Sequence, residues 1–319
     1  MCRFVLNLRG AGLFFKTSNP QEGMMNISVA VIGGGRLGTA IGRQLAGAGY
    51  PITGVCCRTQ ASAGRSAAVI GTEKAVTDPL EITPQAALVL ITTPDDAIAE
   101  TYQAIVKRKG FSENATVLHC SGSLPSTILT APGDAGIAKG SFHPLQSFAA
   151  TDITDKNPFA GIIAAIEGDR RALTVAARLG KDLAVSCFTI KTESKTLYHA
   201  AAVVASNYLV TLVDIAFSLL ESAGINRQDA VTILYPLIRG TLANIDTVGI
   251  PEALTGPIAR GDVKTIADHL QHIRTQNKDL LTIYSRLGMH TVRLAEKKGT
   301  INPAQADALR RLLNEIIDN

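Results

Sequence analysis

The sequence predicts an α/β fold, with a largely parallel sheet covered by helices on both faces and an all-α C-terminal domain after it. Short, apolar, β-branched runs alternate with helical patterns as far as residue 190, an order typical of parallel sheets. From residue 192 onward only helical patterns follow. The chain has 319 residues, enough for two domains of about 150 residues each.

The expected strands are short and contain few polar residues, as strands buried on both faces of a sheet must. We place them at residues 27–32, 52–57, 74–76, 87–92, 115–119, 141–143, 161–166 and 185–190. Helical patterns lie between several of them, at residues 37–48, 95–107 and 170–179. Crossovers of this kind place successive strands in one parallel sheet.

The second half of the chain reads as helices separated by glycine and proline. They span residues 193–223, 228–244, 263–273, 277–296 and 303–317. We therefore expect a sheet domain at residues 25–191 and a helical domain at residues 192–319. Residues 1–24 precede the first strand pattern, and we expect them to form a loose N-terminal extension.

The composition excludes several classes of protein. With 46% hydrophobic and 18% charged residues the chain can form a large core, so extensive disorder is excluded. A net charge of +4 is too dilute for the basic face of a nucleic-acid-binding protein. The five cysteines show neither a C-x-x-C pair nor a zinc spacing, so we expect no metal site and a reducing, cytoplasmic location.

One apolar segment, residues 197–220, lacks Lys, Arg and Glu. It contains His199, Asn207 and Asp214, each of which is costly in lipid, so we expect a central helix buried on all sides and no membrane span. The apolar helices after residue 191 are hard to cover within one chain. We therefore expect a homodimer formed through the helical domain.

A glycine-rich turn follows the first strand. Gly33, Gly35 and Gly38, with Arg36 and Leu37 between the last two, match the pattern G-x-G-x-x-G between a buried strand and a helix. In a Rossmann-type domain the first glycine permits a tight turn, the second lets the backbone approach a pyrophosphate, and the third lets the helix pack on the strand. The helix N-terminus then binds the phosphates. We expect a dinucleotide site here.

The end of the second strand distinguishes NAD from NADP. An NAD enzyme usually has a carboxylate there, which holds the ribose 2′-hydroxyl. This chain has Arg58 and Thr59 instead, with Arg65 on the next helix. Since a guanidinium makes paired, charge-assisted bonds to a phosphate, we predict NADP, with NAD as the alternative. The weaker alternative is that Arg58 is an ordinary solvated arginine.

Polar residues also follow three other strands, at the sheet edge where ligands of parallel sheets bind. Thr93 and Pro94 are expected to lie along the cofactor, and Ser121 and His143 to face the nicotinamide and the substrate. His143 precedes Pro144, which restricts its backbone, and it could exchange a proton near neutral pH. A structural hydrogen-bonding role explains His143 equally well.

The first helix of the second domain carries Lys195 and His199, four residues apart on one face, with Asn207 close to the same stripe. Lys195 could orient a carboxylate or donate a proton, or it could be a solvated lysine. His199 and Asn207 could serve the substrate, or form hydrogen bonds within the helical domain. Arg260, in a loop rich in Gly and Pro, could bind an anionic substrate or pair with Asp262.

Four segments together resemble one family. They are HCSG at 119–122, FHPLQSF at 142–148, KTLYHAAAVVASNYL at 195–209 and LTGPIARGD at 254–262. The family comprises oxidoreductases identified from sequence that join a Rossmann-like domain to a helical domain of unknown function, of the type numbered 2520. The resemblance covers the chain after Met25 and implies a dehydrogenase without naming its substrate.

More distantly, the layout is similar to prephenate dehydrogenases, pyrroline-5-carboxylate reductases and β-hydroxyacid dehydrogenases. Ser121 and His143 resemble the substrate-contacting Ser and His of the first group. Lys195 resembles the catalytic Lys of the last group, but His199 stands where that group has Asn. This departure argues against the exact hydroxyacid chemistry.

The sequence therefore predicts an NADP(H)-dependent oxidoreductase acting on a small, anionic carbonyl, hydroxyl or imine substrate. In it, His143 or Lys195 moves the proton and Ser121 orients the reacting oxygen. The alternative is a non-catalytic NADP-binding sensor or scaffold whose helical domain recruits a partner. Only the enzyme requires these side chains to converge on one reacting point.

Overall fold

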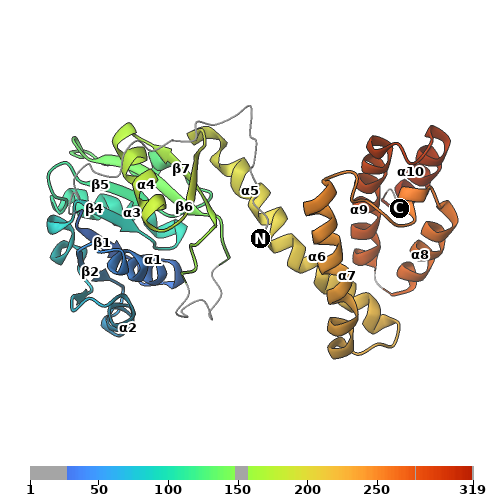
Figure 1. The fold of residues 1–319 in the computed structure, drawn as a ribbon, viewed down its shortest axis with the longest axis horizontal. Coiled ribbons are helices and arrows are strands. Elements are labelled where there is room, and N and C mark those ends of the chain that lie inside the picture. The colour runs from blue at the N-terminus through green and yellow to red at the C-terminus, as the bar shows by residue number, and fades with distance from the viewer. Residues whose placement is uncertain (1–26, 148–156, 277, 318–319) are drawn as a thin grey trace. The chain divides into compact units, whose positions relative to one another are not determined.

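The computed structural model describes residues 27–147, 157–276 and 278–317. The expected N-terminal extension, residues 1–24, lies outside them. The chain divides into two compact units, Met1–Asn207 and Tyr208–Asn319 (Figure 1). The predicted domain boundary, after residue 191, lies earlier in the chain than this division after Asn207. The reason is that the contacts of the helix after residue 191 place that helix in the first unit.

The first unit contains one eight-stranded sheet in the order β3-β2-β1-β4-β5-β6-β7-β8. Strands β1 to β6 pair in parallel, β7 is antiparallel to β6, and β8 is parallel to β7. Because β7 runs antiparallel to β6, that pair is not a parallel crossover unit. The strands are β1 (Val29–Ile32), β2 (Ile52–Cys56), β3 (Ala75–Val76), β4 (Leu88–Ile91), β5 (Thr116–His119), β6 (Ala138–Pro144), β7 (Ile163–Gly168) and β8 (Ser186–Thr189).

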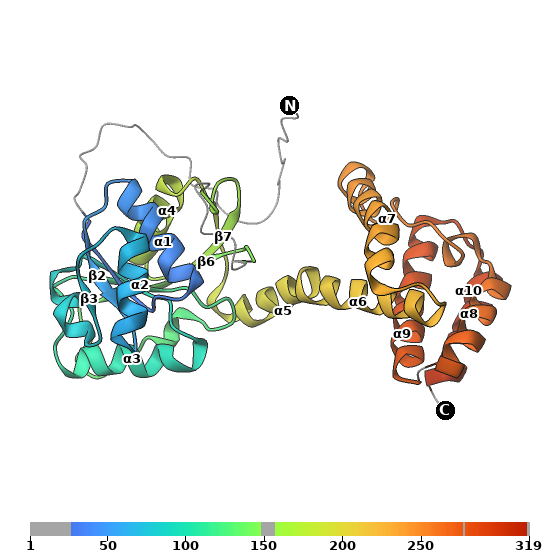
Figure 2. The same ribbon diagram turned by 90° about the horizontal axis from the view of Figure 1, so that it is seen from below.

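Helices cover both faces of this sheet, which confirms the predicted fold class (Figure 2). The hydrophobic cluster on one face includes side chains of α1 (Arg36–Gly47), α2 (Gln60–Ile70) and α4 (Arg170–Asp182). The cluster on the other face includes side chains of α3 (Asp95–Lys107). Successive residues of a strand point to opposite faces. Accordingly Val29 and Val31 join the first cluster, while Ala30 and Ile32 join the second.

The first unit also contains the 3-10 helices η1 (Pro79–Glu81), η2 (Thr83–Gln85), η3 (Ser126–Ile128) and η4 (Thr192–Ser194). Of these, η3 and η4 support the site described below. Helix α5 (Lys195–Ala205) follows η4 directly and is the last element of this unit.

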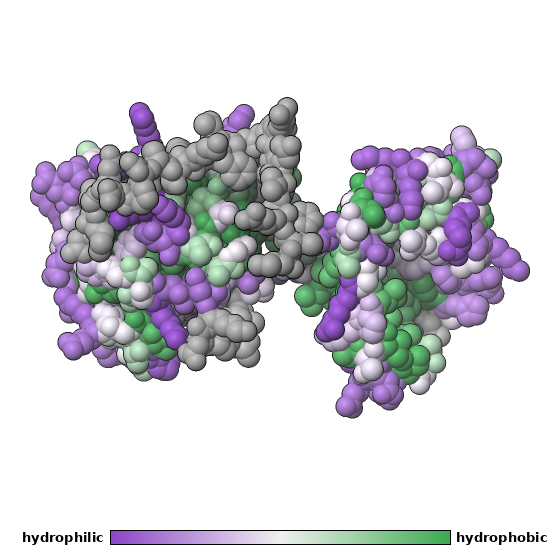
Figure 3. Space-filling view, viewed as in Figure 1, coloured by the Kyte–Doolittle hydropathy of each residue, from purple (hydrophilic) through white to green (hydrophobic). Residues whose placement is uncertain are grey.

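The second unit is helical. Its hydrophobic core comes mainly from α8 (Val263–Gln276), α9 (Lys278–Lys298) and α10 (Pro303–Ile317), together with η5 (Ile258–Arg260). By contrast, α6 (Asn207–Ser222) buries only Phe217 and α7 (Arg227–Val248) only Ala230. Apolar side chains remain at the surface over α6 and α7 (Figure 3).

Residues 197–220 are expected to form a helix buried on all sides, and the structure does not bear this out. They lie within the apolar helical segment from Thr192 to Ser222. It is interrupted at Ser206, and in the single chain 6% of its most apolar window is buried. Leu197 is 77% exposed and Val210 is 70% exposed. By length and hydropathy it is the one described helix that could cross a membrane, but core helices of soluble proteins pass the same test.

Candidate functional site

The glycine-rich turn between β1 and α1 has the shape that a dinucleotide requires. Gly33 has φ +109°, and a Cβ there would lie 2.7 Å from the backbone carbon of Thr92. A Cβ on Gly38 would collide with the Gly33 carbonyl oxygen. Both positions therefore exclude larger residues.

The middle glycine of the motif differs, because a Cβ on Gly35 would meet nothing within 4 Å. Gly35 is the N-cap of α1 and offers no side chain to the first backbone N–H groups, which leaves them to another acceptor. Arg36 and Leu37 form the first turn of this helix. The open space above these amides fits the pyrophosphate of a dinucleotide.

A second anion-binding arrangement lies at the start of α2. Thr59 is the N-cap, and its hydroxyl oxygen accepts a hydrogen bond from the Ser62 backbone N–H at 3.3 Å. Arg65 donates to the Ser62 hydroxyl at 2.9 Å, and Arg58 is exposed beside Thr59. The Arg65 guanidinium and two hydroxyls thus gather at one helix N-terminus, with Arg58 directly before its N-cap. The sequence reasoning missed Ser62, although its position three residues after a Thr N-cap was a usable signal.

The loop after β4 leads into α3 with Pro94 as the N-cap. The Thr93 hydroxyl oxygen is buried without a hydrogen-bond partner among the described residues. A buried hydroxyl of this kind needs a partner, and a bound ligand at the sheet edge would supply one. Thr93 and Pro94 therefore lie where the sequence places them, directly after a strand of the parallel sheet.

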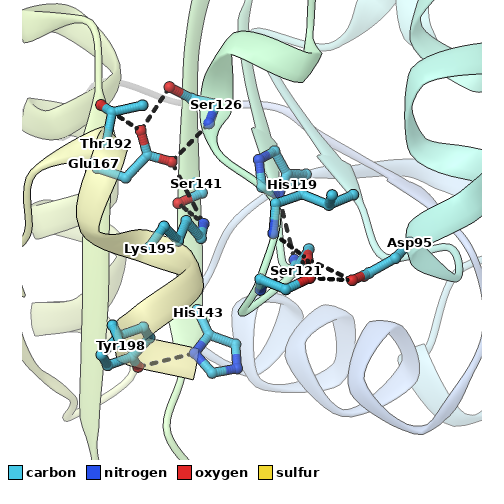
Figure 4. Close-up of polar contacts among 12 residues, drawn as sticks. Asp95, His119, Ser121, Ser126, Ser141, His143, Glu167, Thr192, Lys195 and Tyr198 are labelled. Carbon is cyan, nitrogen blue, oxygen red and sulfur yellow. Dashed lines mark hydrogen bonds and ion pairs between the residues drawn. The ribbon is translucent and has the colours of Figure 1, made fainter. Parts of the chain in front are cut away.

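Ser121 follows β5, and its hydroxyl is fully engaged (Figure 4). It donates to the Asp95 carboxylate at 2.8 Å and accepts from the backbone N–H groups of Ser123 and Leu124, at 3.2 and 3.0 Å. The Ser123 hydroxyl donates to the same Asp95 oxygen at 2.7 Å. These contacts give Ser121 a role in shaping the loop, and its role toward a substrate stays a prediction.

His143 lies on β6 with its two ring nitrogens in different environments. Nδ1 is 2.9 Å from the Tyr198 hydroxyl of α5 (Figure 4). Nε2 approaches Gly122, where a Cβ would lie 2.7 Å from it. Burial lowers the pKa of His143 to about 4, with the charges of Lys195 and His199 acting in the same direction. The ring is therefore neutral at pH 7.

His199 approaches the same glycine from α5. A Cβ on Gly122 would lie 2.5 Å from its Nδ1, which is buried without a partner among the described residues. The rings of His143 and His199 are 6.0 Å apart between centroids and nearly perpendicular, at 78°. The structure thus brings these two histidines together, and only glycine at position 122 leaves them room.

Lys195 is buried rather than solvated, with 1% of its side chain exposed. Its ammonium donates to the Ser141 hydroxyl of β6 and lies 3.4 Å from the Glu167 carboxylate of β7. Burial lowers the pKa of Lys195 to about 8, although the Glu167 charge opposes that shift. Lys195 is therefore held by two partners at the start of α5.

Glu167 collects further hydrogen bonds from elements distant in the sequence. It accepts from the backbone N–H and the hydroxyl of Ser126, at 2.8 and 2.7 Å, and from the Thr192 hydroxyl at 3.0 Å. Burial opposes its ionisation, but the hydrogen bonds from Ser126 and Ser141 and the charge of Lys195 together hold the pKa of Glu167 below its usual value. Sequence reasoning missed Glu167, although a lone carboxylate in an apolar strand signals a buried partner.

His119, at the end of β5, is a further buried imidazole that the sequence reasoning did not assign. Its Nδ1 accepts a hydrogen bond from the Ser121 backbone N–H at 3.2 Å. Burial, with Lys195 adding to the effect, lowers its pKa to about 4. His119 therefore supports the loop that carries Ser121 and Gly122.

Two predicted substrate residues, Asn207 and Arg260, belong to other elements than these side chains do. Asn207 begins α6, and Arg260 ends η5 in the second unit. Asp262, the suggested partner of Arg260, accepts hydrogen bonds from the Thr265 backbone N–H and hydroxyl, at 3.0 and 2.7 Å. These bonds lower the pKa of Asp262, and the charge of Arg260 contributes in the same direction. The roles of Asn207 and Arg260 stay predictions. Among the described residues no group of three His, Cys, Asp or Glu side chains could hold a metal ion.

Comparisons with known proteins agree with this architecture. Residues 17–144 match the family model of a Rossmann-like domain, and residues 162–291 match that of a domain of unknown function, DUF2520. No curated protein matches the chain.

Solved structures are similar over most of the chain. A Bacteroides fragilis protein, named as an NADP oxidoreductase by inference, is 25% identical, with a TM-score of 0.69 over 84% of this chain and 98% of that one. Protein TM1727 of Thermotoga maritima is 24% identical, with a TM-score of 0.62 over 90% and 98%. A pyrroline-5-carboxylate reductase of Coxiella burnetii is 12% identical, with a TM-score of 0.52 over 92% and 98%. The last two show similarity of fold alone.

Proposed function

The chain joins a Rossmann-like domain to the domain of unknown function DUF2520, and from this premise we propose an NADP(H)-dependent oxidoreductase. The substrate is a small carbonyl, hydroxyl or imine compound. One observation carries the proposal: the open backbone at Gly35 and the arginine-rich start of α2 lie at the ends of adjacent strands, β1 and β2. This is the arrangement that a pyrophosphate and a 2′-phosphate of one dinucleotide need.

The residues present fit such a cofactor. The α1 amides after Gly35 would hold the pyrophosphate, and Arg58, Thr59, Ser62 and Arg65 would hold the 2′-phosphate. Thr93 would give its buried hydroxyl a partner. When bound, the nicotinamide supplies a hydride donor or acceptor. The name of the Bacteroides fragilis protein supports the choice of NADP.

The protein's own part in the reaction is to hold the substrate and to handle its proton. We assign the proton transfer to His143. Its Nε2 faces the loop at Gly122, and Tyr198 and His199 lie against its ring. Lys195 holds α5 against β6 and β7 through Ser141 and Glu167, so we assign it to positioning. The expectation that the substrate carries an anionic group depends on Arg260, and it stays a prediction.

Turnover tests this proposal. We would follow NADPH oxidation by the full chain against 2-oxo acids, 3-oxo acids, simple ketones and cyclic imines, with His143→Ala beside the wild type. The proposal predicts turnover of at least one class and a loss of about 100-fold in kcat in the variant, the scale typical of a proton-transferring residue. NADPH binding without turnover of any class would instead favour the non-catalytic sensor or scaffold.

We also propose a homodimer formed through the second unit. Large apolar side chains of α6 and α7 are exposed in the single chain, among them Val210 at 70% and Leu237 at 65%. Isolated soluble chains rarely leave such a continuous surface uncovered. Light scattering of the purified chain should give twice the monomer mass, and a Leu237→Glu variant should shift it toward the monomer. A monomeric wild type would contradict this.

We place the protein in the cytoplasm, with no membrane or nucleic-acid partner.

A further inference from the structure

The hydroxyl of Tyr198, on α5, lies within hydrogen-bond distance of the imidazole of His143. Its hydroxyl lies 2.9 Å from Nδ1, and the two rings meet edge to face with 5.7 Å between their centroids. The opposite ring nitrogen, Nε2, is the one that faces Gly122. The histidine therefore stands between a phenol on one side and the loop after β5 on the other (Figure 4).

The direction of this hydrogen bond follows from the acidities of the two groups. Burial raises the pKa of Tyr198 to about 12, so the phenol keeps its proton at neutral pH. The His143 ring is neutral there, because its pKa is about 4. A phenol is a far stronger acid than a neutral imidazole N–H, so the hydroxyl donates and Nδ1 accepts. The ring proton is then on Nε2, the nitrogen that faces the loop.

The inference rests on the proposed function, in which His143 transfers a proton. A neutral His143 needs a source for that proton, and the hydrogen bond from Tyr198 offers one. With a pKa of about 4, only about one His143 ring in a thousand carries a second proton at pH 7, so an imidazolium is a poor proton source. Lys195 does not replace it, since its ammonium already bonds Ser141 and lies 3.4 Å from Glu167. A neutral histidine needs a second group to restore the proton that it gives.

We propose that Tyr198 and His143 form a two-step proton relay for carbonyl reduction. As the carbonyl carbon gains the hydride that NADPH would supply, the oxygen gains the Nε2 proton: the N–H bond breaks and the product O–H bond forms. The Tyr198 O–H bond breaks, and an Nδ1–H bond forms in its place. The negative charge thus passes from the substrate oxygen to the phenolate, which takes a proton from water.

The surroundings support this route. Tyr198 is half-buried, so the residue is shielded but not closed off from solvent. The charged and titratable groups around His143 are Lys195, His199 and Asp95. Lys195 lies on the same helix as Tyr198, and its positive charge would favour a transient phenolate. In the direction of alcohol oxidation every proton moves the opposite way.

Nuclear magnetic resonance tests the hydrogen-bond assignment without any turnover. In the full chain labelled with ¹⁵N-histidine, His143→Gln identifies the His143 signals. We expect a protonated Nε2 and an unprotonated Nδ1 in the wild type, and a mixture of the two tautomers in Tyr198→Phe. A protonated Nδ1 in the wild type, or the same tautomer in both proteins, would overturn the relay.

The second unit offers a matched control for the loss of one hydroxyl. Tyr284 lies 2.7 Å from Nδ1 of His269, with 6.0 Å between ring centroids and an 84° angle, so this pair resembles the first. Tyr284→Phe removes the same kind of hydrogen bond from a pair to which we assign no chemistry. It should leave the His143 signals and the turnover unchanged.

Kinetics then tests the chemical step. Tyr198→Phe should lower kcat by about 10- to 100-fold, below the full effect of losing His143, and leave KM within about twofold. If the wild type turns over a ketone and Tyr198→Phe keeps the same kcat, the relay is wrong while the proposed function stands. If the wild type turns over nothing in the panel, the proposed function fails and takes the chemical step with it.

Discussion

The Glu167 carboxylate lies 3.4 Å from the Lys195 ammonium, and each side chain is 1% exposed. This ion pair connects strand β7 to the first residue of α5. Glu167 also binds Ser126 of η3 and Thr192 of η4, so one carboxylate joins four elements. The position of α5, and with it that of Tyr198 and His199, depends on this buried cluster.

Removing the charge of Glu167 should therefore destabilise the first unit. Glu167→Gln leaves the Lys195 ammonium buried without its counter-charge, which typically costs about 3–5 kcal/mol. Urea unfolding should show the loss. Glu193→Gln, an exposed carboxylate of η4, is the control and should change the free energy of unfolding by less than about 0.5 kcal/mol. Equal stability of the two variants would show that the ion pair does not hold the helix.

Stability should fall on mild acidification because His119 resists protonation in the folded chain. Its folded pKa is about 4, and the ordinary value is 6.5. The unfolded chain thus binds more protons between these values, and stability is lost as the pH falls through them. From pH 7 to pH 5 this one group should cost about 2 kcal/mol.

Urea titrations at both pH values measure this loss, with His119→Asn for comparison. The asparagine oxygen can accept the Ser121 N–H in place of Nδ1 and does not titrate, so the variant should lose about 2 kcal/mol less than the wild type. Identical pH dependence of the two proteins would exclude His119 as the cause.

Gly122→Ala tests the convergence of the two histidines. The backbone at Gly122 lies outside the left-handed region, so alanine is tolerated there by the main chain. Its Cβ would, however, displace the His143 and His199 rings, which lie 2.7 and 2.5 Å from that point. We expect turnover to fall by at least about tenfold, as for other losses of a catalytic proton group.

The control for that variant is Gly47→Ala, because a Cβ at position 47 meets nothing within 4 Å. It should keep full turnover. Full turnover in Gly122→Ala as well would mean that the histidine pair does not need its present geometry.

Arg58 and Arg65 should select NADPH over NADH. Charge-assisted hydrogen bonds contribute about 1.5–3 kcal/mol, so Arg58→Gln combined with Arg65→Gln should raise the Kd for NADPH about 10- to 100-fold. The Kd for NADH should stay unchanged, because NADH lacks the 2′-phosphate. Lys181→Gln, on α4, should affect neither. A double variant that weakens both dinucleotides equally would place the 2′-phosphate elsewhere.

The sequence predicted the elements whose patterns are local. Helix α3 has the expected bounds, residues 95–107, because its acidic first turn and apolar stripe are contained within the helix. The glycines at 33, 35 and 38 predicted a turn whose geometry depends on neighbouring residues. Polar residues at strand ends also predicted that Ser121 and His143 belong to one edge of the sheet.

Contacts between distant residues could not be predicted in the same way. The pairing of Glu167 with Lys195 depends on the register of β7 beside β6 and on the start of α5. The approach of His199 to Gly122 depends on how α5 packs on the sheet. Composition likewise did not show that the apolar segment breaks at Ser206, since no glycine or proline marks that position.

The central claim is that a pyridine dinucleotide binds at the N-terminus of α1, and calorimetry of the full chain with NADPH tests it most directly. The account predicts saturable binding to the wild type. In Gly35→Val the fold should persist, because the added side chain meets no protein atom within 4 Å of its Cβ, but it would occupy the space of the phosphates, so binding should be lost. A well-folded wild type that binds neither NADPH nor NADH, or a valine variant that binds as tightly, would contradict the account.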